Sequence, residues 1–259
     1  MKRGRFKLKT TALRLLRDVG VTLALWGYFT VGFILLFLPV YLFATGFAAD
    51  RQVAFQRLNH RFYRWFFLLM GRLIPGMSLS VDPQVRSLRS CVIVCNHLSY
   101  LDPLLMIALF PRHRTFVKGI FFRVPVFGWF LRHAGYLPSG DAGNLLERTI
   151  EGIASMEKFL AAGGNVFIFP EGHRSRNGDL GVFHKGAFTI ARHCHAPVMV
   201  LEIRGSQHFF QPGRFLFHAT VAGEITVQLA ARLPADAGSS RQIANRARGV
   251  LMGRMAVPP

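Results

Sequence analysis

A histidine and a carboxylate five positions apart are the pair in this 259-residue chain whose types and spacing could do chemistry. The stretch Cys91-Val-Ile-Val-Cys95 is apolar and partly β-branched, so it predicts a buried strand that ends at Asn96-His97. Asp102 precedes Pro103, and proline favours the first turn of a helix. We therefore expect Asp102 at or near a helix cap, within reach of His97, as the acid that orients a general base. On spacing alone, a capping aspartate beside a polar strand end is the simpler explanation.

A second predicted strand ends abruptly at Pro170-Glu171-Gly172 and is followed by Arg174 and Arg176. The ends of strands in an α/β sheet bind ligands, and arginine suits a phosphate or carboxylate there. Taken alone, a surface turn with solvated arginines explains this stretch equally well.

Together the two stretches resemble the glycerolipid (lysophospholipid) acyltransferase family, typified by 1-acylglycerol-3-phosphate O-acyltransferase. The family's first block, N-H-x-x-x-x-D, is matched by Asn96, His97 and Asp102. Its third block, F-P-E-G-T-R-S, is matched by Phe169 to Ser175, with His173 in place of threonine. The resemblance covers about residues 78–230.

The second block of the family follows the same order here, through Lys118, Pro125, Gly128 and Gly135. The chain departs from the family at the end of this block. It reads Gly135-Tyr-Leu-Pro-Ser139, without the arginine that the family assigns to the glycerol-phosphate end of the acceptor. In the fourth block a second proline is expected near Val200, and only Pro197 is present.

The resemblance implies an O-acyltransferase that moves a fatty acyl group from a thioester, acyl-CoA or acyl carrier protein, to the hydroxyl of a lysolipid. The most direct acceptor is 1-acylglycerol-3-phosphate; another lysolipid, such as a lyso-aminolipid, is the alternative. His97 and Asp102 would be catalytic, backbone N–H groups near Gly172 would be candidates for the oxyanion site, and no metal or cofactor is expected. The expected substrate-binding residues are Lys118, Glu171, Gly172, Arg174 and Ser175, although Glu171 could serve only to order the turn.

Other classes of function have less support in the sequence. No Gly-x-Ser-x-Gly motif is present, which disfavours a serine lipase or thioesterase. Three cysteines without a repeated spacing disfavour a disulfide framework or a zinc site. A non-enzymatic, basic membrane-docking protein stays open, and such a protein would not need His97.

The elements that must position these residues are those of an α/β domain. We predict a mixed sheet with covering helices, of the glycerol-3-phosphate acyltransferase type. A helical pattern runs from Leu145 to Leu160, closed by Gly163-Gly164, and a basic amphipathic helix capped by Ser239 or Ser240 follows at the end. The predicted strands are Ser78–Val81, Cys91–Cys95, Thr115–Lys118, Gly135–Leu137, Val166–Phe169, Val198–Ile203, Phe215–Val221 and Ile225–Leu229.

The N-terminal part predicts a membrane-embedded helical segment. The chain has a net charge of +19 yet is 51% hydrophobic, which favours a membrane surface over nucleic acid as its partner. No charged residue occurs from Val19 to Ala49, a run long enough to cross a bilayer, although Pro39 could kink or break it.

The basic residues on both sides of this run favour a hairpin, with residues 52–78 as a second membrane-contacting segment. A single span followed by an amphipathic helix is the alternative. In either arrangement we expect the catalytic domain on the cytoplasmic face of the inner membrane. The expected domains are a basic N-terminus and anchor (1–77), an acyltransferase domain (78–238) and a basic C-terminal helix and tail (239–259).

Overall fold

A sheet of seven strands organises the part of the chain that this computed structural model describes, which is residues 2–140, 151–175, 177–211 and 213–255. The order of the strands is β1-β7-β6-β2-β5-β3-β4, and all neighbours are parallel except β6 and β7. The predicted mixed α/β sheet is therefore confirmed. The strands are β1 (Met77–Val81), β2 (Val92–Cys95), β3 (His113–Lys118), β4 (Leu137–Ser139), β5 (Asn165–Ile168), β6 (Val198–Arg204) and β7 (Gly223–Leu233).

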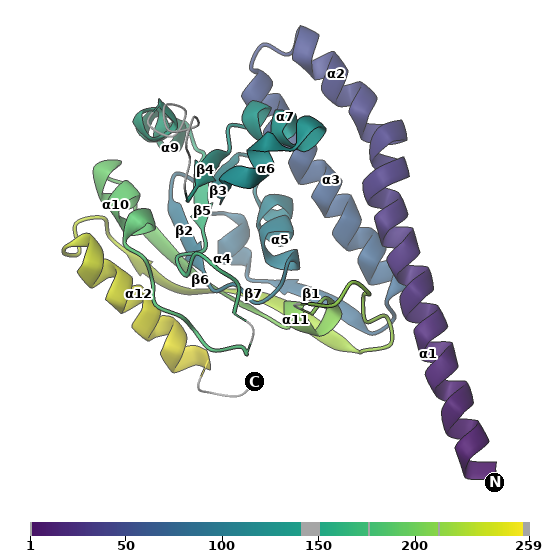
Figure 1. The fold of residues 1–259 in the computed structure, drawn as a ribbon. Coiled ribbons are helices and arrows are strands. Elements are labelled where there is room, and N and C mark those ends of the chain that lie inside the picture. Colours follow the sequence, from purple (N-terminus) through teal and green to yellow (C-terminus); the bar gives the residue numbers. More distant parts are fainter. Residues whose placement is uncertain (1, 141–150, 176, 212, 256–259) are drawn as a thin grey trace.

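Helices cover both faces of the sheet (Figure 1). One face carries α9, α10 and α12, which pack mostly aliphatic side chains onto it. The other carries α3, α5, α6 and α7. The helices are α1 (Lys2–Gly27), the π-helical η1 (Tyr28–Phe37), α2 (Leu38–Phe47), α3 (Arg51–Leu73), α4 (Pro83–Arg86), α5 (Leu101–Leu109), α6 (Gly119–Arg123), α7 (Pro125–His133), α9 (Met156–Ala161), α10 (Gly186–His193), α11 (Ser206–Phe209) and α12 (Ser240–Met255).

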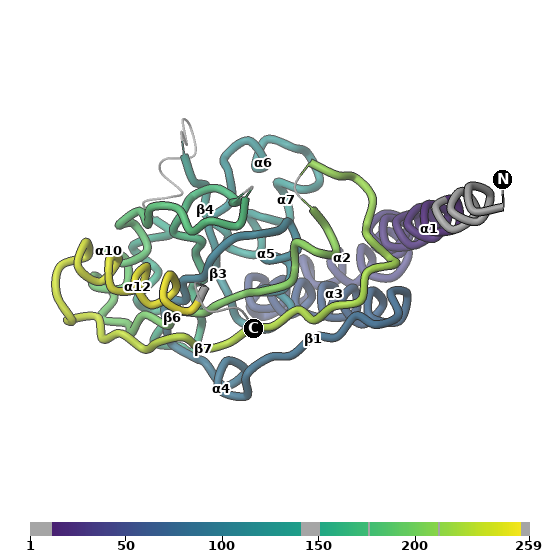
Figure 2. Tube along the Cα trace, turned by 90° about the horizontal axis from the view of Figure 1, so that it is seen from below, coloured from purple at the N-terminus to yellow at the C-terminus, as the bar shows by residue number. Residues whose placement is uncertain are grey.

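The N-terminal arm, as we call residues 2–47, is a continuous helical run that extends away from the sheet (Figure 2). Its stretch Ala12–Phe47 is long and apolar enough to cross a membrane, by length and composition. Pro39 does not break the run. The turns before it widen into a π-helix, in which the N–H of Leu38 donates to the carbonyl of Phe33, five residues back.

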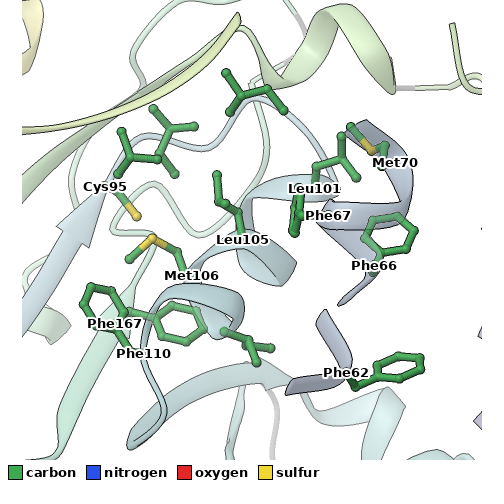
Figure 3. Close-up of a cluster of buried hydrophobic side chains, with 14 of the residues drawn as sticks. Phe62, Phe66, Phe67, Met70, Cys95, Leu101, Leu105, Met106, Phe110 and Phe167 are labelled. Atoms are coloured by element: carbon green, nitrogen blue, oxygen red, sulfur yellow. The ribbon is translucent and has the colours of Figure 1, made fainter. Parts of the chain in front are cut away.

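Helix α3 runs back along the arm, so the two form a helical hairpin (Figure 1). The prediction that residues 52–78 have their aromatic face in a membrane interface needs correction, because Phe62, Phe66 and Phe67 are buried in the protein core. Figure 3 shows Phe66, Phe67 and Met70 beside Leu101 of α5, with Phe62 further along α3. Trp65 and Leu68 are large apolar side chains of this stretch that remain exposed and available to lipid.

The predicted strand Phe215–Val221 is wrong, since this segment is an irregular loop that docks on the arm. Two of its backbone N–H groups bond to side chains of α1 instead of a neighbouring strand. The N–H of Phe217 donates to Thr22 Oγ1 at 2.9 Å, and that of Ala219 donates to Asp18 Oδ1 at 2.8 Å. The ring of Phe215 stacks on Trp26, with ring centroids 5.3 Å apart.

Three smaller expectations were also tested. The fourth strand begins at Leu137 instead of Gly135, because Gly135 forms a turn with φ +72°. Gly135 also lies so close to Gln52 of α3 that a Cβ at this position would be 1.4 Å from the Gln52 side chain. The predicted helix from Leu145 to Leu160 lies partly outside the described residues. At the C-terminus, Ser239 caps α12, because its Oγ accepts from the N–H of Gln242.

Candidate active site

The loop that contains His97 and the loop that contains Glu171 leave the sheet side by side, at the carboxyl ends of β2 and β5. These strands are parallel neighbours, with Val94 opposite Ile168. Asn96 continues the end of β2 by bonding to β6: its side chain donates to the carbonyl of Ile203 and accepts from the N–H of the same residue, both at 2.8 Å. This pairing fixes where the chain leaves the sheet, and His97 is the next residue.

His97 and Asp102 meet as the spacing predicts. Nδ1 of His97 lies 3.0 Å from Oδ2 of Asp102, whose side chain is fully buried. The same oxygen accepts from the backbone N–H groups of Leu98 and Ser99, at 2.6 and 2.7 Å. A carboxylate with these donors acts as an acceptor, so Nδ1 must carry the imidazole proton. The lone pair is then on Nε2, the nitrogen suited to accept a proton from a substrate.

Asp102 is the second residue of α5 and not its cap, which is Tyr100. In the first turn of a helix, a carboxylate is stabilised by the helix dipole and by unpaired N–H groups. The prediction that Asp102 lies at or near the cap is therefore met within the first turn. The start of the helix thus holds the carboxylate in place, with Oδ2 directed at His97.

Glu171 lies beneath the same histidine and is 1% exposed. Its Oε1 accepts from the backbone N–H of His97 at 3.1 Å, and its Oε2 accepts from the N–H of Gly181 at 2.8 Å. Both carboxylate oxygens thus bind the protein backbone. This geometry fits the alternative that Glu171 orders the turn, because its side chain links the loop at His97 to the loop at Gly181.

Gly172 and Ser175 build the turn after β5. Gly172 has φ +69°, and its N–H donates to the carbonyl of Phe169 at 3.1 Å. That N–H is therefore engaged, so an oxyanion site here would use other backbone N–H groups near Gly172, which stays a prediction. The N–H of Ser175 donates to the carbonyl of His97 at 2.8 Å, while its Oγ accepts from the N–H of Gly178 at 2.9 Å. Both residues line the cavity described below.

The guanidinium of Arg174 stacks on the ring of Tyr100, with Cζ 3.6 Å from the ring centroid. Its Nε and Nη1 atoms are buried and have no hydrogen-bond partner among the described residues. A half-buried guanidinium with two unbonded nitrogens is suited to receive an anion. Tyr100 was missed in the sequence, where an aromatic residue inside the first block was the available signal.

A cavity of about 2460 Å³ joins these groups. It is lined by His97, Tyr100, Lys118, Glu171, Gly172, Arg174 and Ser175, and it continues along the aromatic side chains Trp26, Phe29 and Phe33 of the arm. Typical small-molecule pockets are roughly 300–1,000 Å³, so this one has room for two substrates. Lys118, at the end of β3, is exposed on its rim.

Comparisons with known proteins agree with the motifs. The family "Acyltransferase" matches residues 80–204. A chloroplastic 1-acyl-sn-glycerol-3-phosphate acyltransferase of Brassica napus is 34% identical over 128 residues, which are 48% of this chain and 35% of that protein. The chain thus spans about a third of the length of this plant relative. A 1-acyl-sn-glycerol-3-phosphate acyltransferase of Pseudomonas aeruginosa is 26% identical, with 73% of each chain covered.

A solved structure shares the fold almost from end to end. The crystal structure of the 1-acyl-sn-glycerophosphate acyltransferase PlsC from Thermotoga maritima matches with a TM-score of 0.73. The match covers 95% of this chain and 99% of that one, at 20% sequence identity. The likeness therefore includes the N-terminal helices as well as the sheet.

Proposed function

We propose, from the premise that this chain belongs to the glycerolipid acyltransferase family, that it transfers a fatty acyl group from a thioester donor to the hydroxyl of a lysolipid. The observation that carries the proposal is the His97–Asp102 pair, 3.0 Å apart, on the wall of a cavity that also contains Arg174. A base and an anion-binding group then face one space. This is the arrangement needed to activate a hydroxyl on a molecule with an acidic headgroup.

The proposed chemistry uses the tautomer of His97 that has its proton on Nδ1. Its Nε2 takes the proton of the acceptor hydroxyl as the oxygen forms a bond with the thioester carbon. The C–S bond then breaks, and the thiolate leaves and takes up the proton from the imidazolium. Asp102 fixes the ring tautomer and stabilises the imidazolium, and a positioned base of this kind contributes on the order of 10²–10⁴-fold in rate. No cofactor, metal or covalent enzyme intermediate is needed.

The cysteines do not compete with His97 for the role of nucleophile or base. All three, Cys91, Cys95 and Cys194, are free and buried. Burial raises the pKa of Cys95, the cysteine at the end of β2, and the charges of Asp102 and Glu171 raise it further. A thiol with a raised pKa stays protonated and unreactive at neutral pH.

We further propose 1-acylglycerol-3-phosphate as the acceptor. The relatives' names support it, and so does the unpaired guanidinium of Arg174. The second block ends at Ser139 without the family's arginine, but another cation lies beside it. Lys118 is opposite Ser139 in the pairing of β3 with β4. The phosphate would lie between Lys118 and Arg174. Another lysolipid, such as a lyso-aminolipid, is the second candidate, favoured by that missing arginine alone.

The arm supports a membrane setting for the reaction. Each CH₂ group moved into water costs about 0.8 kcal/mol, so an acceptor and product that remain in the leaflet avoid a large cost. We propose that the arm inserts into the inner membrane and that the sheet lies on its cytoplasmic face. The thioester, acyl-CoA or acyl carrier protein, would then come from the aqueous side.

A panel of acceptors and donors tests the proposal. The purified chain in phospholipid vesicles is given acyl-CoA or acyl carrier protein, with 1-acylglycerol-3-phosphate or a lyso-aminolipid, and the new ester is followed by mass spectrometry. We expect turnover with 1-acylglycerol-3-phosphate and none in the His97→Ala variant. Turnover with the lyso-aminolipid alone would overturn the acceptor but keep the reaction. Equal turnover by wild type and His97→Ala would overturn the reaction and revive a non-enzymatic, membrane-docking role.

A further inference from the structure

Arg248 lies on α12, outside the residues 80–204 that match the family. Its side chain leaves the helix and binds the loop after β5. Nε donates to the carbonyl of Gly181 at 2.8 Å, and Nη2 donates to the carbonyl of Leu180 at 3.2 Å. Two bonds from one planar guanidinium fix both the position and the orientation of this short piece of backbone.

The bound peptide group is the one that reaches the active site. The carbonyl of Leu180 and the N–H of Gly181 belong to a single peptide unit, since the peptide bond joins them. That N–H donates to Oε2 of Glu171 at 2.8 Å, and Oε1 of Glu171 accepts from the backbone N–H of His97 at 3.1 Å. A continuous hydrogen-bonded path therefore runs from Arg248 through one peptide and one carboxylate to the residue that carries the base.

Electrostatics strengthens this path. A cation on the carbonyl and an anion on the N–H polarise the same peptide in the same direction, which makes both hydrogen bonds stronger than each would be alone. Glu171 is 1% exposed, so water screens it little. A Cβ added to Gly181 would approach its Oε2 to 3.2 Å, so the backbone lies close to the carboxylate. The described residues from 177 to 184 form neither helix nor strand and depend on such side-chain bonds for their position.

We infer that Arg248 is a positioning residue for the proposed acyl transfer. It fixes the position of His97 through the Leu180–Gly181 peptide and Glu171. The inference rests on the proposed function, because the residue it positions is the proposed base. Arg248 itself does not line the cavity, whereas Leu180, Gly181 and Glu171 do, so it acts only through the groups that it holds in place.

The experiment compares Arg248→Gln with Arg248→Lys and with Arg246→Gln. Arg246 is the matched control: it is exposed on the same helix, loses the same charge, and donates to the carbonyl of Ala237 at 3.2 Å. We expect Arg248→Gln to lower kcat on the order of 10-fold, with the KM of both substrates within about twofold of wild type. Arg248→Lys keeps the charge but not the fork, so its kcat lies between the two. Arg246→Gln keeps the wild-type kcat.

A double-mutant cycle with Glu171→Gln tests the route. If Arg248 acts through Glu171, Arg248→Gln lowers kcat much less in the Glu171→Gln background than in wild type, whereas independent roles give additive losses. An unchanged kcat in Arg248→Gln, an equal loss in Arg246→Gln, or an additive cycle would each overturn the inference.

Hydrogen exchange separates this inference from the proposed function. We expect the amide protons of Gly181 and His97 to exchange about 10-fold faster in Arg248→Gln, or in Arg248→Lys if the glutamine variant does not fold, and at the wild-type rate in Arg246→Gln. If no donor and acceptor give turnover in wild type, the proposed function fails, and faster exchange still supports the positioning of His97. Unchanged exchange overturns it.

Discussion

Two histidines in this protein bind a partner through the same ring nitrogen and have opposite surroundings. His97 directs Nδ1 at the carboxylate of Asp102, 3.0 Å away, and its side chain is 16% exposed on the cavity wall. His113 directs Nδ1 at the carbonyl of Phe110, 2.6 Å away, and is fully buried. Its Nε2 is covered as well, at 2.5 Å from the hydroxyl of Tyr136.

The difference between the two partners decides what each ring can do. A carboxylate stabilises the imidazolium that forms when a base takes a proton. At His113 the carbonyl of Phe110 also favours the protonated ring, but burial outweighs it. Burial lowers the pKa of His113 to about 3, so its ring is neutral at physiological pH. A neutral ring with Nδ1 as donor accepts a hydrogen bond at Nε2 from Tyr136. The same residue type is therefore the proposed base at one place and a structural link at the other.

The link of His113 reaches the N-terminal arm. The hydroxyl of Tyr136 accepts from the side-chain amide of Asn59 at 3.2 Å, and Oδ1 of Asn59 accepts from the hydroxyl of Tyr41 at 2.5 Å. This chain joins β3 to α3 and to the arm through buried groups. It holds the arm against the sheet at one end of the cavity.

The largest effect should come from His97→Ala. Loss of the base lowers kcat on the order of 10²–10⁴-fold, with little change in stability because the ring is partly exposed. Initial rates of ester formation and thermal unfolding measure the two quantities. A variant that kept the wild-type kcat would remove the contrast between the two histidines.

Asp102→Asn should have the next largest effect. An amide in place of the carboxylate neither stabilises the imidazolium nor enforces the tautomer with the proton on Nδ1, so kcat should fall on the order of 10²-fold. The two backbone N–H groups that now bind Oδ2 also lose a charged acceptor. Steady-state kinetics at several substrate concentrations should show the loss in kcat. A loss confined to KM would mean that Asp102 shapes the site without assisting the base.

Acid should lower the stability of the protein through His113. The pKa of His113 is lower in the native state than in the unfolded one, so its neutral form contributes full stability above about pH 6.5. That stability is lost as pH falls towards 3, at about 1.4 kcal/mol per pH unit, or about 2 kcal/mol between pH 7 and pH 5. Denaturant unfolding at both pH values should show this loss in wild type and a smaller one in His113→Gln. Equal losses would assign the acid sensitivity to other groups.

Tyr136→Phe should have the smallest effect. It removes the hydroxyl between His113 and Asn59 and leaves the ring packed, which costs about 1–2 kcal/mol of unfolding free energy. Because the hydrogen bonds of this link include neither His97 nor Asp102, kcat should stay within about twofold of wild type. Unfolding and initial rates on the same preparation check both parts. A large fall in kcat would instead show that the attachment of the arm limits catalysis.

Local patterns were enough to predict much of this protein. The apolar runs before Asn96 and Pro170 predict buried strands, and Pro103 predicts the helix start that brings Asp102 to His97. These are short-range effects, because the relevant contacts join residues only a few positions apart. The mixed sheet and the terminal helix with its cap at Ser239 follow from the same kind of pattern.

The tertiary structure decided what depends on contacts between distant residues. The aromatic face of α3 matched a membrane interface in the sequence, yet the fold buries it against α5 and the arm. Residues 215–221 have the composition of a strand, but Thr22 and Asp18, about 200 positions earlier, take their hydrogen bonds. The partners of Tyr100 and Arg248 have the same origin. Spacing along the chain determines a helix turn or a strand end, whereas which buried donor meets which acceptor depends on the order of the strands and on the packing of the whole.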